Sequence, residues 1–167
     1  MTELYDRLQR YSVSDYYGFH MPGHKRNTAR FGSDLPYVIV ITVIEGFDDL
    51  HHPDVILKEA QEKGSRIYGT GETRFLVNGS TAGILSAILG CTRKGDQVLV
   101  GRNCHKSVYH AIYMNELEPV YLYPGFRPDI QLNTEISVSA VKAALNEHSR
   151  VKAVILVSPT YDGVVSD

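Results

Sequence analysis

The alternation of short apolar segments with helical segments after residue 74 most constrains what this chain can fold into. β-Branched runs fit strands, whereas apolar residues spaced three or four apart fit helices. Strands that alternate with helices form βαβ units, and right-handed crossovers then give a parallel sheet with both faces covered. The expected strands are 75–78, 97–100, 119–123 and 151–157, and the expected helices are 82–91, 106–115 and 137–147.

The residues before this alternation show fewer regular patterns. Apolar residues four and three apart near the N-terminus indicate one helical face, and β-branched runs favour extended chain. The expected elements are a helix over 2–11, a loop at Pro22-Gly23, a strand or extended segment over 37–44 and a helix over 54–68. We therefore expect an N-terminal helix and extended arm over residues 1–50, and the first part of a larger α/β domain over residues 51–167.

Composition excludes several classes of protein. Hydrophobic residues make up 43% and charged residues 22% of the chain, which is typical of a globular protein and not of a disordered one. Apolar runs fall far short of the roughly 20 residues of a membrane span, and no secretory signal is visible. A net charge of −2 gives no basic surface for nucleic acid, and two cysteines form no disulfide framework. We expect a cytoplasmic protein that binds neither membranes nor nucleic acid.

The strongest local signal for a binding site is the turn Gly79-Ser80-Thr81 between an expected strand and an expected helix. Backbone N–H groups and the positive end of the helix dipole attract anions at such a point, and glycine lets a ligand approach the backbone. The turn therefore predicts a phosphate site, although it matches neither a Walker A loop nor GxGxxG. Simple capping of the helix by Ser80 or Thr81 explains the same residues equally well.

A second candidate site follows the expected strand 97–100, where the residues read Arg102-Asn103-Cys104-His105-Lys106-Ser107. Ligands of parallel sheets bind beyond the carboxyl ends of the strands, so His105 should lie at the same sheet end as Ser80 and Thr81, around one cleft. His105 could stack on a planar ligand whose phosphate binds at that turn. It could also only bond to backbone at the start of a helix, and the residues alone favour this second interpretation.

Metal and hydrolase chemistry fit the sequence poorly. His20 and His24 are four apart, but Pro22-Gly23 between them prevents a shared helical face. The chain has no CxxC, HExxH or GxSxG motif, and no expected strand-to-helix turn presents Cys91 as a nucleophile. We therefore expect no metal site.

Five stretches together resemble the fold-type-I pyridoxal-phosphate (PLP) decarboxylases of the ornithine/lysine/arginine group. They are 18–25 (GFHMPGHK), 45–52 (EGFDDLHH), 75–83 (FLVNGSTAG), 101–107 (GRNCHKS) and 158–163 (SPTYDG). The resemblance covers nearly the whole chain, and PGHK, FLVNGST and RNCHKS in this order are specific. It implies part of a fold-type-I large domain, a mostly parallel sheet flanked by helices that is incomplete over this length.

The resemblance also implies roles for individual residues. Ser80 and Thr81, on the Gly79 turn, would hold the cofactor phosphate. His105 would stack on the pyridine ring, and the turn from Ser158 to Thr160 would approach the ring from another strand end. The implied enzyme is a homodimer that removes the α-carboxylate of lysine, ornithine or arginine as CO2 by way of an external aldimine.

Two groups that such a decarboxylase needs have no match in these 167 residues. Family members pair an aspartate with the pyridine nitrogen and use a Schiff-base lysine in a Ser-x-His-Lys pattern, both after the SPTYDG strand. Lys106 follows a histidine, but Asn103 stands where the serine should be, and Asp167 lies too close to SPTYDG. We therefore expect a truncated chain that carries no catalytic residue and is inactive alone.

Two other interpretations stay open. The chain could be a non-catalytic remnant that keeps a phosphate- or PLP-binding turn or only partners a full-length subunit. Valine at positions 40 and 43, where the family has acidic residues, fits that interpretation. The chain could also belong to another fold-type-I enzyme, such as an aminotransferase or aldolase, although HMPGHK and RNCHKS argue against this.

Overall fold

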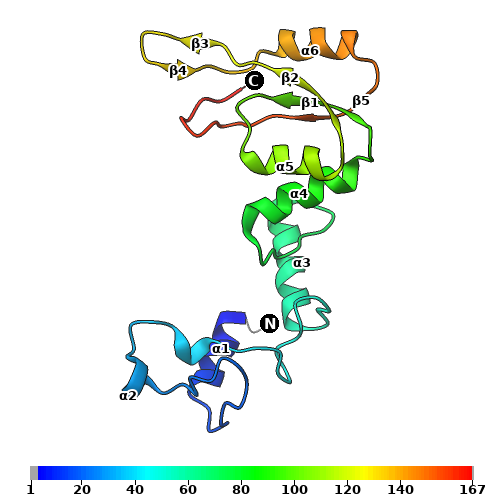
Figure 1. Cartoon of the computed structure of the whole chain (residues 1–167). Helices are drawn as coiled ribbons and strands as arrows, with labels where there is room; N and C mark the ends of the chain where they lie inside the picture. Colours follow the sequence, from blue (N-terminus) through cyan, green and yellow to red (C-terminus); the bar gives the residue numbers. More distant parts are fainter. Residues whose placement is uncertain (1–3, 167) are drawn as a thin grey trace. The chain divides into compact units, whose positions relative to one another are not determined.

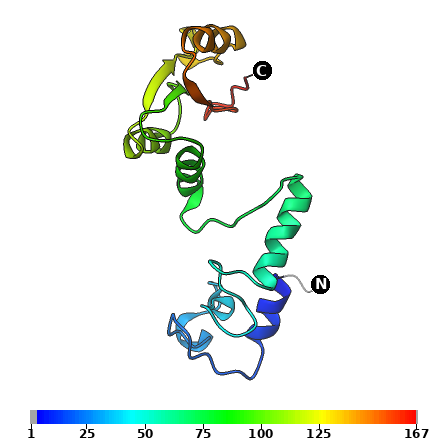
Figure 2. The ribbon, with the colours of Figure 1, turned by 90° about the vertical axis from the view of Figure 1, so that its right-hand side faces the viewer.

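The computed structural model of the chain describes residues 4–166, so Asp167 lies outside the described residues. The chain divides into two compact units, Met1–Phe75 and Leu76–Asp167, which are described separately (Figure 1 and Figure 2). The division after residue 50 expected from the sequence stays a prediction. None of the described helices combines the length and hydropathy that crossing a bilayer requires.

A three-stranded parallel sheet in the order β2-β1-β5 forms the centre of the second unit. β1 (Gln97–Gly101) pairs with β2 (Glu118–Leu122) on one side and with β5 (Val151–Ile155) on the other. Val98, Leu99 and Val100 of β1 expose no surface. A continuous apolar strand buried on both faces is what a covered parallel sheet requires, so this part of the sequence analysis is confirmed.

Three helices cover the two faces of this sheet. They are α4 (Gly79–Cys91), α5 (Lys106–Met114) and α6 (Val138–Glu147). One core cluster joins alternate residues of β1 to α4 and α5, and it contains Ile88, Val98, Val100, Val108 and Ile112. On the other face, Leu99 packs with Leu122 and Ile136 beneath α6 (Figure 1). The expected α/β architecture, a parallel sheet flanked by helices, is therefore confirmed.

The expected strand 75–78 does not form. Phe75, Leu76 and Val77 are 45%, 53% and 68% exposed, and α4 begins at Gly79, three residues earlier than expected. A strand is stable only when its backbone groups pair with a neighbour. Within residues 4–166 no strand pairs with this segment, so its apolar composition is not enough.

A short antiparallel hairpin between β2 and α6 was not expected from the sequence. Its strands are β3 (Phe126–Arg127) and β4 (Leu132–Asn133). At its tip the Arg127 guanidinium pairs with the Asp129 carboxylate, and the Gln131 amide donates to the carbonyl of Pro128 at 2.7 Å. Gln131 has φ = +55°, a left-handed conformation that is uncommon for a residue other than glycine. The spacing of apolar residues in the sequence does not predict such a turn.

The first unit contains α1 (Leu4–Ser12), α2 (Thr28–Phe31), the 3₁₀ helix η1 (Tyr37–Ile39) and α3 (Ile56–Tyr68). The end of α1 is held by Arg26, whose Nη1 donates to the carbonyls of Tyr11 at 2.6 Å and Ser12 at 3.2 Å. A cation there satisfies terminal carbonyls and opposes the negative end of the helix dipole. The segment 37–44, expected as a strand or extended segment, begins with η1 and has no strand pairing, so the strand alternative is wrong, whereas Val40 directly after η1 is extended.

The acidic segment before α3 has a structural role that the sequence analysis missed. The N-cap residue of α3 is Val55, whose side chain makes no capping hydrogen bond. The carboxylate of Asp48 caps the helix instead, from outside it. Oδ2 of Asp48 accepts hydrogen bonds from the backbone N–H groups of Val55 at 2.8 Å and Leu57 at 2.9 Å. A carboxylate at this end of a helix satisfies otherwise unpaired donors and complements the dipole.

Candidate functional site

The strand pairing of the second unit brings two expected site segments to one end of the sheet. His105 follows the carboxyl end of β1, and Ser158 follows the carboxyl end of β5, its parallel neighbour. The loop after β1 also contacts the last residue of β5, because the Cys104 thiol lies 3.6 Å from the carbonyl oxygen of Ile155. This is the end of a parallel sheet at which ligands bind.

The first turn of α4 contains Gly79, Ser80 and Thr81. Asn78 is the N-cap residue and makes no side-chain capping bond, so the expectation that Ser80 or Thr81 caps the helix is wrong. Gly79 has φ = +66°, and apart from the adjacent residues and the backbone of α4 no atom lies within 4 Å of where its Cβ would be. Ser80 and Thr81 are exposed. The first turn of α4 therefore has no side-chain cap from Asn78 and carries two exposed hydroxyl residues, an arrangement suited to an anion.

The packing of α4 on α5 indicates where the first turn of α4 lies. At the far end of both helices, the side-chain amide of Asn115, just after α5, donates to the carbonyl of Thr92 at 3.2 Å and to its hydroxyl at 3.0 Å. Thr92 directly follows α4. The two helices therefore end together and begin away from this contact, which favours the expectation that Ser80, Thr81 and His105 share one cleft. That shared cleft stays a prediction.

His105 is the N-cap residue of α5. Its Nδ1 accepts the backbone N–H of Ser107 at 3.2 Å and lies 2.9 Å from the Ser107 hydroxyl. The helix-start role that the residues alone favoured is thus present in the structure. The ring remains exposed, so a role in stacking on a ligand is compatible with the cap.

The hydroxyls of Ser158 and Thr160 organise the turn after β5. Thr160 Oγ1 accepts the N–H of Val164 at 3.1 Å, and Ser158 Oγ accepts the N–H of Ser166 at 3.1 Å. Ser158 is exposed and Thr160 is partly buried. These contacts give the turn a defined shape at the sheet end where the family resemblance expects it to approach a ring.

An arginine–tyrosine cluster fixes the loop after β1, and the sequence analysis did not identify it. The Arg102 guanidinium lies over the rings of Tyr109 and Tyr121, 5.3 Å and 5.6 Å from their centroids. Nη1 of Arg102 donates to the Tyr109 hydroxyl at 2.9 Å, and this hydroxyl donates to the Arg102 carbonyl at 2.7 Å. The hydrogen bond with Tyr109 is the main cause that raises the pKa of Arg102. Seven residues separate the partners, so only the turn into α5 brings them together.

The cysteine in the same loop is not set up as a nucleophile. Cys104 is buried, and burial raises the pKa of its thiol above the usual value. A protonated thiol is a poor nucleophile. Across residues 4–166, the structure forms no cluster of three or more histidine, cysteine or acidic side chains that could hold a metal ion.

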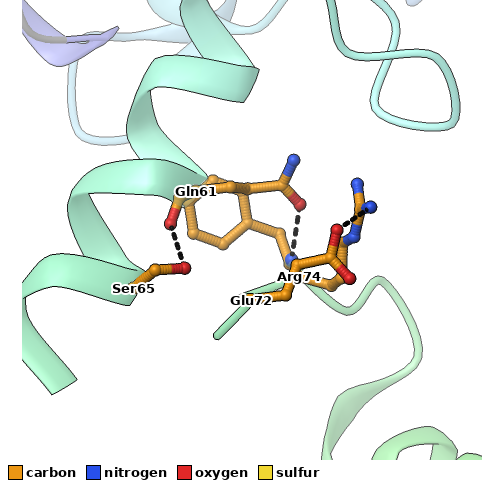
Figure 3. A network of polar contacts seen from close by, with 5 residues as sticks. Gln61, Ser65, Glu72 and Arg74 are labelled. Atoms are coloured by element: carbon orange, nitrogen blue, oxygen red, sulfur yellow. Dashed lines mark hydrogen bonds and ion pairs between the residues drawn. The ribbon is translucent and has the colours of Figure 1, made fainter. Parts of the chain in front are cut away.

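The first unit carries a separate depression of about 760 Å³ along α3 and the loop that follows it. Gln61 is 6% exposed there, and its Oε1 accepts the N–H of Phe75 at 3.1 Å. Ser65 donates to the Gln61 carbonyl at 3.3 Å, and Glu72 pairs with Arg74 (Figure 3). This network fixes the loop back onto α3, and the sequence patterns gave no sign of it.

Comparison with protein families gives a match over nearly the whole chain. The family described as "Orn/Lys/Arg decarboxylase, major domain" matches residues 2–167. This chain belongs to that family. The resemblance identified from PGHK, FLVNGST and RNCHKS is thereby confirmed.

Curated relatives agree with the family assignment. The chain is 40% identical to the uncharacterized protein YaaO of Bacillus subtilis, over 99% of this chain and 36% of YaaO. It is 33% identical to an arginine decarboxylase of Bacillus cereus, over 99% of this chain and 37% of that protein. It therefore spans little more than a third of the length of these relatives.

Solved structures support the fold. The structure of lysine decarboxylase A from Pseudomonas aeruginosa matches 97% of this chain with a TM-score of 0.71 and 24% identity, over 25% of its own length. The constitutive lysine decarboxylase of Escherichia coli matches 97% of this chain with a TM-score of 0.70 and 22% identity, over 26% of its own length. The fold of this chain thus corresponds to part of a larger decarboxylase fold.

Proposed function

We propose that this chain is the phosphate-binding part of a PLP-dependent decarboxylase that acts on lysine, ornithine or arginine. The observation that carries the proposal is the open first turn of α4, where the N–H groups after Asn78 have no capping side chain. It lies within the FLVNGST motif of a chain that belongs to a decarboxylase family. A dianionic phosphate fits such a helix start, because the N–H groups and dipole supply positive charge without a buried lysine.

The residues at the sheet end fit the rest of this cofactor. Ser80 and Thr81 would donate their hydroxyls to phosphate oxygens, and Gly79 would let the phosphate approach the backbone. The exposed ring of His105 would lie against the pyridine ring, and the turn from Ser158 to Thr160 would limit movement of that ring from the β5 side. When bound, PLP supplies an electron sink for the charge left behind as CO2 departs.

This chain by itself would bind the cofactor weakly and would not turn over substrate. Neither histidine–lysine pair of these 167 residues, at Lys25 and at Lys106, is preceded by the serine of the Ser-x-His-Lys pattern. The aspartate that would pair with the pyridine nitrogen also has no match. We infer that the full activity needs a homodimer of cytoplasmic subunits that carry these groups, with substrate choice set outside the segments described here.

Titration of the 167-residue chain with PLP, followed by absorbance, tests the proposal. Each hydroxyl that bonds a charged phosphate is worth about 1.5–3 kcal/mol, so Ser80→Ala and Thr81→Ala should each weaken PLP binding about tenfold or more. Ser86→Ala is the matched control, because Ser86 is an exposed serine further along the same helix. Equal PLP affinity in all four proteins would overturn the proposal.

A decarboxylation assay on the same chain tests the claim of inactivity. With PLP and lysine, ornithine or arginine we expect no release of CO2, and borohydride should trap the cofactor at no single lysine. Turnover accompanied by trapping at one lysine would contradict this claim, and Lys106 would be the first residue to replace.

A further inference from the structure

The hydrogen bonds around His105 determine which of its ring nitrogens carries a proton. Nδ1 lies 3.2 Å from the backbone nitrogen of Ser107, and a backbone N–H can only donate. Nδ1 is therefore the unprotonated nitrogen of the neutral ring, and its proton is on Nε2. The Ser107 hydroxyl, 2.9 Å from the same Nδ1, must then be a second donor to it.

The Ser107 hydroxyl is buried, and a buried hydroxyl destabilises the folded state unless it forms a hydrogen bond. Its side chain exposes no surface and lies in the first turn of α5, next to Val108 of the apolar core cluster. A buried hydroxyl without a partner destabilises the folded state, whereas alanine would fit the same volume. The cap of α5 does not need this hydroxyl, because the backbone N–H of Ser107 already bonds His105.

The backbone that leads into His105 is fastened independently of Ser107. The N–H of Arg102 donates to the carbonyl of Leu122 at 2.7 Å, and the N–H of Cys104 donates to the carbonyl of Gly101 at 3.1 Å. The stacked Arg102 side chain adds a third attachment through Tyr109. What the Ser107 hydroxyl can still control is therefore the orientation and tautomer of the His105 ring.

We propose that Ser107 is a positioning residue that holds His105 as the Nε2–H tautomer. The exposed side of the ring then offers a hydrogen-bond donor to an anionic oxygen, a carboxylate of the substrate or a phosphate of the cofactor. In this state Nε2 carries a proton and has no free lone pair, so at this atom His105 can only donate a hydrogen bond to the anion that it orients. This inference rests on the proposed function, in which His105 lies beside the cofactor.

Histidine tautomers are read directly from long-range ¹H–¹⁵N correlations of the ¹⁵N-histidine-labelled 167-residue chain, without cofactor. We expect the Nε2–H pattern for His105. Ser107→Ala removes one of two donors to Nδ1, and a neutral hydrogen bond contributes about 0.5–1.5 kcal/mol, so the tautomer ratio should fall about fivefold. An Nδ1–H pattern in the unmodified chain, or a ratio changed less than twofold by Ser107→Ala, would overturn the proposal.

Ser139→Ala is a control matched in position and geometry. Ser139 is the second residue of α6, as Ser107 is of α5, and its hydroxyl lies 2.9 Å from that of the N-cap residue Ser137. This variant should leave the His105 spectrum unchanged, and a change of equal size would also overturn the proposal. Should Ser107→Ala prevent folding, Ser107→Cys keeps a weaker donor and should give an intermediate tautomer ratio.

PLP titration separates failure of this inference from failure of the proposed function. Under the inference, Ser107→Ala weakens PLP binding about threefold, and His105→Asn, which keeps a capping oxygen but loses the ring, weakens it further. If Ser80→Ala and Thr81→Ala reduce affinity while Ser107→Ala changes neither tautomer nor affinity, only the positioning role fails. If Ser107→Ala shifts the tautomer while Ser80→Ala and Thr81→Ala have no effect, the phosphate site fails and the tautomer assignment stands.

Discussion

Replacing Gly79 by alanine should destabilise the chain and close the start of α4 to a phosphate. Gly79 has φ = +66°, a left-handed conformation that costs an L-residue roughly 1–2 kcal/mol. Apart from the adjacent residues and the backbone of α4 itself, no atom lies within 4 Å of the position that the new Cβ would take, so the cost comes from the backbone conformation and not from a clash with packed neighbours. We therefore expect Gly79→Ala to lower the free energy of unfolding by about 1–2 kcal/mol.

The same chemical change further along α4 should have the opposite sign. Gly90 also has open space around its Cβ position but keeps an ordinary φ, so alanine there should stabilise the helix by about 0.5–1 kcal/mol. Gly79→Asn should fall between glycine and alanine, because asparagine tolerates the left-handed region better. Urea unfolding followed by circular dichroism measures all three variants. Equal effects of Gly79→Ala and Gly90→Ala would refute the assignment of strain to position 79.

Three further predictions concern residues outside the first turn of α4. Asp48→Ala should lower the free energy of unfolding, measured by urea unfolding, by about 1–2 kcal/mol, because α3 loses its only side-chain cap among the described residues. Asp48→Asn should keep part of this stabilisation, because its amide oxygen can still accept hydrogen bonds at the helix start. Exposed Cys91 should react with iodoacetamide at neutral pH well before Cys104, because burial raises the pKa of the Cys104 thiol. Mass spectrometry of the labelled chain measures the order, and faster labelling of Cys104 would contradict this prediction. The hydrogen bond from the Arg127 guanidinium lowers the pKa of the Asp129 carboxyl in the folded chain. The stability that this pair contributes is therefore present above the pKa of the unfolded chain and is lost as the pH falls through the folded pKa. An NMR titration in which Arg127→Gln leaves the pKa of Asp129 unchanged would contradict this prediction.

The elements that could be predicted from the sequence are those whose partners also lie in the chain. β1 reads as a continuous apolar run, and both of its neighbours, β2 and β5, are present to pair with it. The segment 75–78 reads equally well as a strand but lacks a partner among the described residues, so it stays exposed. Composition reports the tendency to form a strand, whereas pairing decides whether one forms.

The sequence predicted which loops carry the candidate site, but it did not predict the hydrogen bonds within those loops. The order of strands and helices placed His105 and Ser158 after two strands of one parallel sheet, and the structure shows that these strands, β1 and β5, are neighbours. The sequence could not show that Asn78, and not Ser80 or Thr81, is the N-cap residue of α4. Nor could it show that Tyr109 holds Arg102 or that Ser107 bonds the His105 ring, because these contacts depend on the turn into α5.

The central claim is that the cofactor binds at the sheet end formed by α4, β1 and β5. Backbone ¹H–¹⁵N spectra of the 167-residue chain during PLP titration test it most directly, with Ser80→Ala as the comparison. We predict that the amide signals of Gly79, Ser80 and Thr81 move together with those of His105 and residues 158–160, with one saturation curve that Ser80→Ala shifts to higher PLP concentration. Shifts confined to the depression along α3, or scattered over surface lysines without saturation, would contradict the account.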